Sequence, residues 1–214
     1  PPGPEPAERA RHLLARDKVI FAGQPVAVVV ADSPYTAADA AELVAVEYEE
    51  LPAVVDPLEA MRPDAPAIRP KELEGEWAEA GMHATVSGGE ELDVRRLPAN
   101  VTNAVRFHRG DVAQGFASAD LVIERIYRTP FVHQSYLEPH ASVAVPRPDG
   151  GVTIYTSTQG MFYCRNVTAT TLGLPHEQVT IVPMEVGGGF GGKTVLLEPL
   201  VAAVALRLDR PVKL

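Results

Sequence analysis

Cysteine is almost missing from this chain. One of the 214 residues is a cysteine, Cys164, and a disulfide needs two, so the chain holds no internal disulfide framework. An iron–sulfur cluster takes about four thiolates, so this chain alone cannot hold one. Cys164 follows Phe162 and Tyr163 in a predicted helix, and we expect it to be a small core residue and not a nucleophile.

Basic residues and long apolar runs are also scarce. The 19 Lys and Arg are outnumbered by 28 Asp and Glu, which gives a formal net charge of −9. This balance argues against nucleic acid or an anionic membrane surface as the main partner. No apolar run approaches the roughly 20 residues of a transmembrane helix, and no signal-peptide pattern opens the sequence. We therefore expect a soluble, cytoplasmic chain without a membrane span.

Proline, by contrast, is abundant. The chain has 20 prolines in 214 residues, against about 5% in an average protein. Hydrophobic periodicity disappears between residues 57 and 100, and structureless stretches of this length are uncommon inside compact domains. We predict a domain over 1–60, incomplete at its N-terminus, a linker over 61–100 and a second domain over 101–214.

The first predicted domain has a strand–helix–strand pattern. Residues 26–31 form a continuous β-branched run, typical of a strand buried on both faces. Asp32, Ser33 and Pro34 are a helix-start signal before an alanine-rich helix. Residues 45–49 alternate and predict a second strand. A short helical stretch over 7–14 is expected before this unit.

The second predicted domain mixes strands and helices. Strands are expected at 121–127, 141–145, 152–156 and 179–184. Helices are expected at 160–172, ending at Gly173, and at 195–208, where the residues are apolar nearly all round and predict burial. Asp149-Gly150 predicts a hairpin turn. The fold class is α/β (α+β).

A glycine-rich loop at 187–194 lies between a predicted strand and a predicted helix. Its five glycines expose backbone N–H groups and let a bulky ligand touch the main chain. A tight turn without ligand is the simpler alternative, although one or two glycines suffice for that. The spelling also fits the P-loop and dinucleotide patterns. The residues after Thr194 contain neither the later magnesium-binding strand nor the acidic residue that these folds need, so nucleotide binding is a remote third alternative.

The loop 186–193 resembles that of the molybdenum hydroxylase family, which includes xanthine dehydrogenase, aldehyde oxidase and carbon monoxide dehydrogenase. The match is to the large, molybdopterin-binding subunit. Further matching segments follow in the family's order: 23–32, 48–52, 110–120, 136–140, 156–159 and 210–213. The resemblance implies a small α/β hammerhead domain followed by the first part of a molybdopterin-binding domain of mixed sheet and helices.

The resemblance also implies site residues and a reaction. The main chain of Phe190 and Gly191 would lie beside the molybdenum, and the full implied cofactor-binding set is Gly188, Gly189, Phe190, Gly191, Gly192, Gln159 and Gln134. The implied reaction is the water-dependent oxidation of an aldehyde or an N-heteroaromatic compound. Purine-oxidising members carry an acidic residue where this chain has Thr194, so purines are disfavoured as substrates. Many relatives carry a glutamine where this chain has Val132, and Gln134 is the candidate replacement.

The implied cofactor is molybdenum–molybdopterin, in its cytosine dinucleotide form, with no protein ligand to the metal from this chain. Partner subunits would carry 2Fe–2S clusters and FAD, and a dimer of such heterotrimers is expected. The general-base glutamate is expected beyond the end of the chain, which alone would be incomplete and inactive. The alternative is a truncated or non-catalytic domain of this fold without cofactor.

His133, Glu138 and His140 could suggest a metal site, but we favour a structural role in which Glu138 fixes a turn.

Overall fold

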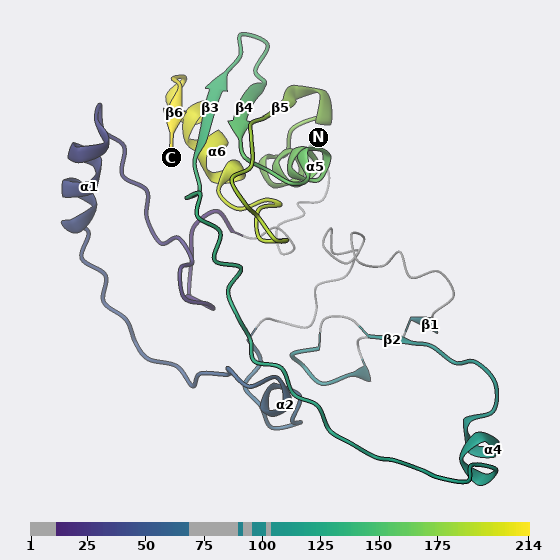
Figure 1. The fold of residues 1–214 in the computed structure, drawn as a ribbon. Coiled ribbons are helices and arrows are strands. Elements are labelled where there is room, and N and C mark those ends of the chain that lie inside the picture. The colour runs from purple at the N-terminus through teal and green to yellow at the C-terminus, as the bar shows by residue number, and fades with distance from the viewer. Residues whose placement is uncertain (1–11, 69–89, 92–95, 102–103) are drawn as a thin grey trace. The chain divides into compact units, whose positions relative to one another are not determined.

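The computed structural model describes residues 12–68, 90–91, 96–101 and 104–214 (Figure 1). These divide into two compact units, one over Leu14–Thr129 and the other over Pro130–Leu214. The helical stretch predicted over 7–14 lies largely outside the described residues. No helix of the described residues combines the length and the hydropathy that crossing a membrane requires.

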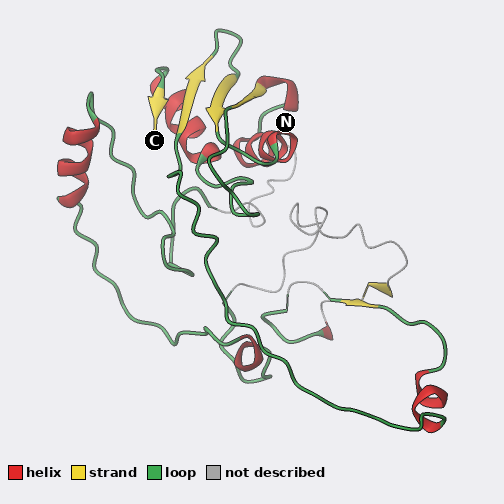
Figure 2. Ribbon diagram, in the orientation of Figure 1, coloured by secondary structure: helices red, strands yellow, loops and turns green. Residues whose placement is uncertain are grey.

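The second unit is built on a four-stranded sheet (Figure 2). Its strands are β3 (Ser142–Pro146), β4 (Val152–Thr156), β5 (Val179–Pro183) and β6 (Val212–Lys213), in the order β5-β4-β3-β6. Strand β4 runs parallel to β5, and β3 is antiparallel to both β4 and β6. The strands predicted at 141–145, 152–156 and 179–184 are thereby confirmed.

The turn between β3 and β4 confirms the predicted hairpin. Gly150 has a φ of 81°, which glycine adopts without strain. Both carboxylate oxygens of Asp149 accept hydrogen bonds from Arg147, and one also accepts from Gly151 N at 3.0 Å. The Arg147 guanidinium and the Gly151 amide hold the pKa of Asp149 below its usual value.

Two helices cover one face of this sheet. Helix α5 (Met161–Leu172) packs on β5, helix α6 (Glu198–Leu208) packs on β3, and the two helices contact each other. The short 3-10 helix η2 (His176–Gln178) leads into β5. Side chains from both layers form the core: Ala144, Val152, Ile154, Ala169, Val179, Val201, Ala202 and Ala205.

Helix α6 begins later than predicted. The sequence pattern indicated a start at residue 195, whereas the helix starts at Glu198. Pro199 is the physical reason. A start at 195 would require an N–H at residue 199 for a hydrogen bond to the carbonyl four residues earlier, and proline has none. The predicted burial of the helix holds for its first two turns.

The first unit contains the short helices α1 (Pro34–Glu42), α2 (Pro57–Ala60) and α4 (Val112–Ala117), and the antiparallel pair β1 (Glu90–Glu91) and β2 (Val105–Arg106). The predicted helix start is confirmed: Ser33 caps α1 by accepting from Thr36 N at 3.1 Å, and Pro34 occupies the first turn. Asp56 and Asp111 cap α2 and α4 in the same way.

Three strand predictions in the first unit are wrong. Residues 26–31, 45–49 and 121–127 are not assigned to strands in the structure. The burial on both faces predicted for 26–31 is also wrong, because Val30 is 51% exposed. An alternating or β-branched run becomes a strand only where another strand pairs with it, and no such pairing forms among the described residues.

Candidate functional site

The glycine loop follows β5 and is irregular in backbone conformation. Gly188 and Gly191 have φ values of 96° and 86°, and Phe190 has a φ of 50°. Phe190 is 73% exposed, so the tip of the loop reaches the surface of this unit. The expected helix N-terminus beside the loop is not there, because α6 begins only at Glu198.

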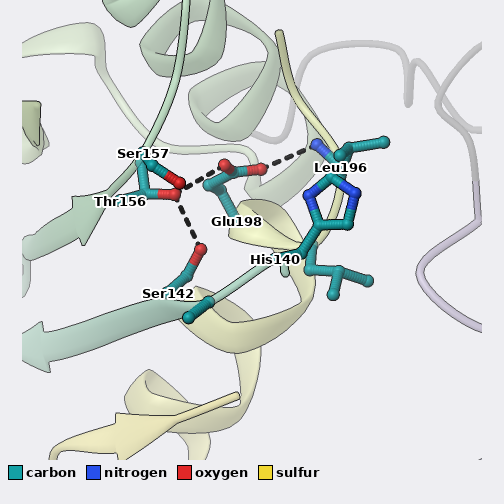
Figure 3. A pocket seen from close by; sticks show the side chains of 8 residues that line it. His140, Ser142, Thr156, Ser157, Leu196 and Glu198 are labelled. Carbon is teal, nitrogen blue, oxygen red and sulfur yellow. Dashed lines mark hydrogen bonds between the residues drawn. The ribbon is translucent and has the colours of Figure 1, made fainter. Parts of the chain in front are cut away.

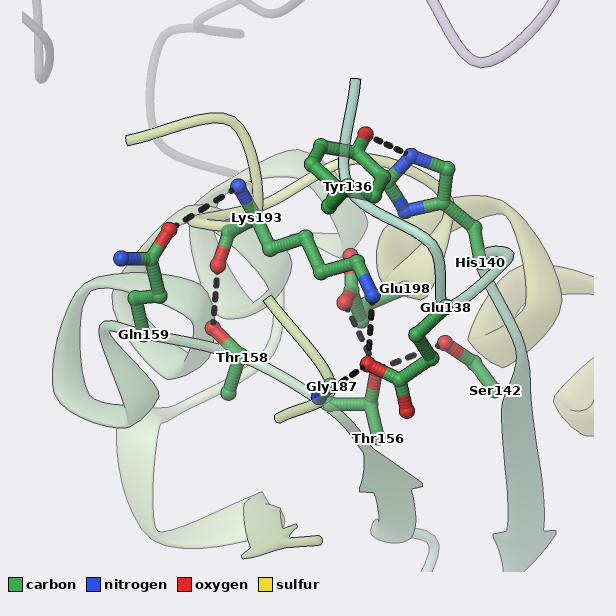
Figure 4. A network of polar contacts seen from close by, with 10 residues as sticks. All are labelled: Tyr136, Glu138, His140, Ser142, Thr156, Thr158, Gln159, Gly187, Lys193 and Glu198. Carbon is green, nitrogen blue, oxygen red and sulfur yellow. Dashed lines mark hydrogen bonds and ion pairs between the residues drawn. The ribbon is translucent and has the colours of Figure 1, made fainter. Parts of the chain in front are cut away.

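Gln159 supports the loop from the end of β4 (Figure 4). Its Oε1 accepts hydrogen bonds from Gly191 N at 3.1 Å and Lys193 N at 3.3 Å, and its own backbone N–H donates to the Lys193 carbonyl at 2.7 Å. A Cβ on Gly189 would lie 2.4 Å from Oε1, so a larger residue at this position would displace the Gln159 side chain from the loop. The Nε2 group of Gln159 donates to no residue that the structure describes.

Side chains of the irregular segment 134–138 also contact the loop. A Cβ on Gly187 would lie 2.8 Å from Glu138 Cβ, and one on Gly192 would lie 2.9 Å from Tyr136 Cε1 and 3.1 Å from Gln134 Cδ. Ser135, between Gln134 and Tyr136, has a φ of 51°, so the segment is irregular and not a strand. The loop glycines therefore permit close contact with the chain's own side chains.

An ion pair between a buried lysine and a partly exposed glutamate joins this segment to the end of the loop. The Lys193 ammonium donates to Glu138 Oε2 at 2.5 Å, and the same oxygen accepts from Gly187 N at 2.7 Å. The Lys193 side chain is 0% exposed and that of Glu138 is 31% exposed. Lys193 Nζ also lies 4.6 Å from the centre of the Tyr136 ring. Lys193, and then the Gly187 amide, hold the pKa of Glu138 below its ordinary value.

These contacts argue against the P-loop alternative. A P-loop lysine must reach the phosphates of a nucleotide, and the loop must open a helix. Lys193 is buried and paired with Glu138, and α6 does not begin at the loop. Glu138 has a structural role, as predicted, and the turn that it fixes is the glycine loop itself.

Two further residues considered in the sequence analysis, Thr194 and Cys164, lie in the same unit as the glycine loop. Thr194 is half-buried, and its Cγ2 would lie 3.1 Å from a Cβ on Gly160. Cys164 is fully buried, and burial raises the pKa of its thiol to about 12. A thiol in that state is not a nucleophile near neutral pH, so the prediction of a core cysteine is confirmed.

The two histidines near the loop have partners within their own segment. His133 Nδ1 accepts from Ser135 N at 2.9 Å, and His140 Nε2 is hydrogen-bonded to the Tyr136 hydroxyl. Burial, followed by the nearby Lys193 charge, lowers the pKa of His140. In the part of the chain that the structure describes, no three His, Cys, Asp or Glu side chains gather as metal ligands.

Glu198 is a buried polar residue that the sequence analysis missed (Figure 3). It is 5% exposed, and its carboxylate accepts hydrogen bonds from the Thr156 hydroxyl at 2.8 Å and from Leu196 N at 2.7 Å. Because Thr156 donates to Glu198, the Ser142 hydroxyl at 2.8 Å donates to Thr156. A cavity of about 10 Å³ beside them has room for about one water molecule. An acidic residue opening an apolar helix was the available signal.

Comparison with known proteins identifies the fold around this loop. A family model described as the molybdopterin cofactor-binding domain matches residues 94–214, more than half of the chain. The chain belongs to the molybdenum hydroxylase large-subunit family. A second family model, the a/b hammerhead domain of aldehyde oxidase and xanthine dehydrogenase, matches residues 2–52. The predicted order of a hammerhead domain and then a molybdopterin-binding domain is confirmed.

Individual relatives agree with this assignment. The chain is 34% identical over 203 residues to a probable xanthine dehydrogenase subunit of Bacillus subtilis, covering 94% of this chain and 24% of that protein. It is 37% identical over 208 residues to the carbon monoxide dehydrogenase large chain of Hydrogenophaga pseudoflava, with the same coverage. Among solved structures, the Cu,Mo-CO dehydrogenase in its carbon monoxide reduced state matches with a TM-score of 0.69 and 32% identity, over 94% of this chain and 24% of that one. The chain thus spans about a quarter of the length of these relatives.

The loop of this molybdenum hydroxylase chain fits a molybdopterin cofactor. The backbone N–H groups of Gly188, Gly189 and Phe190 donate to no residue that the structure describes. On the Cβ side of Gly191 there is open space to 4 Å, so a flat ligand could approach the main chain there. Backbone N–H groups in such turns suit anionic and oxo groups, and the supports behind the loop are already made within the chain.

Proposed function

We propose that this chain supplies part of the cofactor site of a molybdenum hydroxylase-type oxidoreductase that carries a molybdenum–molybdopterin cofactor, in the cytosine dinucleotide form. One observation carries the proposal. The loop 187–192 is anchored by Gln159, Glu138 and Lys193, while Phe190 and Gly191 at its tip face open space. Such a loop is preorganised to present its main chain to a ligand.

The loop residues divide the work of binding. The free N–H groups of Gly188, Gly189 and Phe190 would donate to acceptor atoms of the cofactor, and Gly191 would let it approach the backbone. Gly192 would let Tyr136 and Gln134 pack against the loop beside the cofactor. Gln159 uses its oxygen on the loop and keeps its Nε2 donors for the cofactor. When bound, the cofactor supplies the two-electron oxidation of the substrate with water as oxygen source.

Gln134 is proposed to replace the family glutamine that contacts the metal's oxo group. Its side chain lies against Gly192 of the loop. Val132, at the position that matches the family glutamine, is 72% exposed and carries no hydrogen-bonding side chain. The position of Gln134 beside the loop therefore supports the proposal that Gln134 contacts the cofactor in place of the family glutamine.

The proposed substrate is an aldehyde or an N-heteroaromatic compound, not a purine. The position after Lys193 is Thr194, and a hydroxyl cannot hold a purine nitrogen with the charge of a carboxylate. The general-base glutamate is proposed to lie elsewhere in the full-length protein, because the glutamate that contacts the loop, Glu138, is committed to Lys193 and Gly187.

Several wider features are part of the same proposal. The electrons would pass to iron–sulfur and FAD subunits, as the family resemblance implies. A dimer of heterotrimers and a cytoplasmic location stay predictions. The domain bounds 1–60, 61–100 and 101–214 are also proposed. The family matches over 2–52 and 94–214 support them.

Cofactor content tests the proposal directly. The full-length protein would be purified with its partner subunits, and its molybdenum and pterin measured per chain. We expect both at close to one per large subunit, with turnover of aldehydes or N-heteroaromatics exceeding that of purines. A properly assembled complex containing neither molybdenum nor pterin would favour the non-catalytic alternative, and faster turnover of purines would refute the substrate class.

A further inference from the structure

The glycine loop carries a strained residue at its tip that the surrounding contacts hold in place. Phe190 has a φ of 50°, in the left-handed region that side chains other than Gly, Asn and Asp rarely adopt. It is 73% exposed, so burial of its own ring does not explain the conformation. Strain of this kind persists only where neighbouring structure imposes it, and it often marks a functional site.

The residues after Phe190 show where the constraint comes from. Gly191 N and Lys193 N both donate to Gln159 Oε1, and the Lys193 side chain then turns inward to Glu138. Glu138 also accepts from Gly187 N at the start of the loop. The single carboxylate oxygen of Glu138 thus connects both ends of the loop.

We propose that Glu138 and Lys193 are positioning residues that set the shape of the glycine loop for the cofactor, an inference that rests on the proposed function above. They touch no reacting atom; they act through Gly187 and through the backbone at Lys193. Burial makes the pair specific, because a fully buried ammonium needs its counter-charge. A surface ion pair would not constrain the loop to this extent.

The two partners differ in what their loss leaves behind. Glu138→Gln leaves the Lys193 ammonium at 0% exposure without a counter-charge, whereas Lys193→Met leaves a carboxylate that is 31% exposed and still accepts from Gly187 N. We therefore expect Glu138→Gln to disturb the loop more than Lys193→Met. If the pair acts as a unit, the double variant will lose no more cofactor than Glu138→Gln alone.

The hairpin offers a matched control. Asp149, like Glu138, is a carboxylate that accepts from a basic side chain, Arg147, and from a glycine N–H, that of Gly151. Its pKa is lowered for the same reasons, but it lies in the turn between β3 and β4. Asp149→Asn removes an equivalent charge without touching the loop.

The experiment uses the full-length protein assembled with its partner subunits. We would measure three quantities: the molybdenum and pterin content, the electron paramagnetic resonance signal of Mo(V), and the hydrogen exchange of the loop amides. The proteins compared would be wild type, Glu138→Gln, Lys193→Met, the double variant and Asp149→Asn. We expect Glu138→Gln to retain the cofactor about tenfold more weakly than wild type, and Lys193→Met to lose less of it. In both variants the cofactor that is retained should give an altered Mo(V) signal, and the amides of 188–191 should exchange faster. Asp149→Asn should not differ from wild type in any of these measurements.

Each alternative outcome has a distinct meaning. If wild type binds cofactor and both single variants keep its content, the Mo(V) signal and the loop exchange of wild type, the positioning role is refuted while the proposed function stands. Equal losses in Asp149→Asn would also refute it, because the effect would then be general destabilisation. A wild-type complex without cofactor would instead refute the proposed function. If Glu138→Gln does not assemble, Lys193→Met decides the question.

Discussion

Among single residues, two carboxylates organise the second unit in different ways. Glu198 is nearly fully buried and is satisfied by neutral donors, Thr156 and Leu196 N, so it ties α6 to the sheet. Glu138 is partly exposed and is satisfied by a buried cation and a backbone N–H. The first carboxylate supports the fold, whereas the second supports the loop.

The Glu138 carboxylate predicts a defined pH dependence. Its pKa is lowered from 4.5 by Lys193 and by the Gly187 amide, so its stabilising contribution is complete above that value and is lost as the pH falls through the lower, folded-state pKa. The difference in unfolding free energy between wild type and Glu138→Gln should be constant from about pH 5 to 8 and should shrink below pH 4.5. Urea denaturation across this range measures it.

A difference that instead narrows on raising the pH from about 5 to about 8 would contradict this assignment. Asp149→Asn serves as the control, because the pKa of Asp149 is lowered from a starting value of 3.8. The difference in unfolding free energy between wild type and Asp149→Asn should persist to a lower pH than the difference between wild type and Glu138→Gln.

Among the elements of the second unit, helix ends direct the path of the chain. Helix α5 ends at Gly173 with a φ of 67°, and α6 ends at Asp209 with a φ of 50°. Both residues are in the left-handed conformation that closes a helix and turns the chain into the next segment. Gly173 meets this demand without strain, whereas Asp209 also places a negative charge at the negative end of the helix dipole.

The two helix ends should therefore respond in opposite directions to substitution. Asp209→Gly is expected to raise the free energy of unfolding by about 0.5–1 kcal/mol, through relief of backbone strain and loss of the charge. Gly173→Ala should lower it by about 1 kcal/mol, and this cost is conformational, because the added Cβ would meet no side chain or backbone beyond its own chain neighbours. Chemical denaturation measures both, and destabilisation by Asp209→Gly would contradict the argument.

Over the part of the chain that the structure describes, buried residues are unevenly distributed. Every residue of the core cluster lies between Ala144 and Ala205, and the four-stranded sheet and both of its helices belong to the same unit. The first unit has three short helices and one two-residue strand pair among its described residues, and many of its large apolar side chains are exposed.

This distribution predicts the order of proteolysis. Backbone that lacks ladder hydrogen bonds and buried apolar contacts opens at low free-energy cost, so a nonspecific protease should first cut this 214-residue chain within 14–129. A resistant fragment that begins near residue 130 and retains the C-terminal sheet should accumulate, as identified by mass spectrometry. First cuts inside β3, β4 or β5 would show that stability is distributed differently.

Local patterns were sufficient to predict much of the second unit. The strands β3, β4 and β5, the hairpin at Asp149-Gly150 and the end of α5 at Gly173 follow from alternation, turn residues and glycine, which act over a few neighbouring positions. The family resemblance likewise depended on short motifs in a fixed order, and the comparisons confirm it. The runs at 26–31, 45–49 and 121–127 follow the same strand rules, but they lack pairing partners among the described residues.

The sequence was thus sufficient to predict the family, the order of the domains and the presence of a glycine loop, because each depends on short contiguous segments. How the loop is held depends on the folded chain. Lys193 is buried against Glu138, a residue 55 positions earlier, and Gln159 lies beneath the loop from 34 positions before Lys193. A lysine after a glycine run is equally compatible with phosphate binding or with a buried ion pair, and the choice depends on which distant side chains the fold brings within hydrogen-bonding distance.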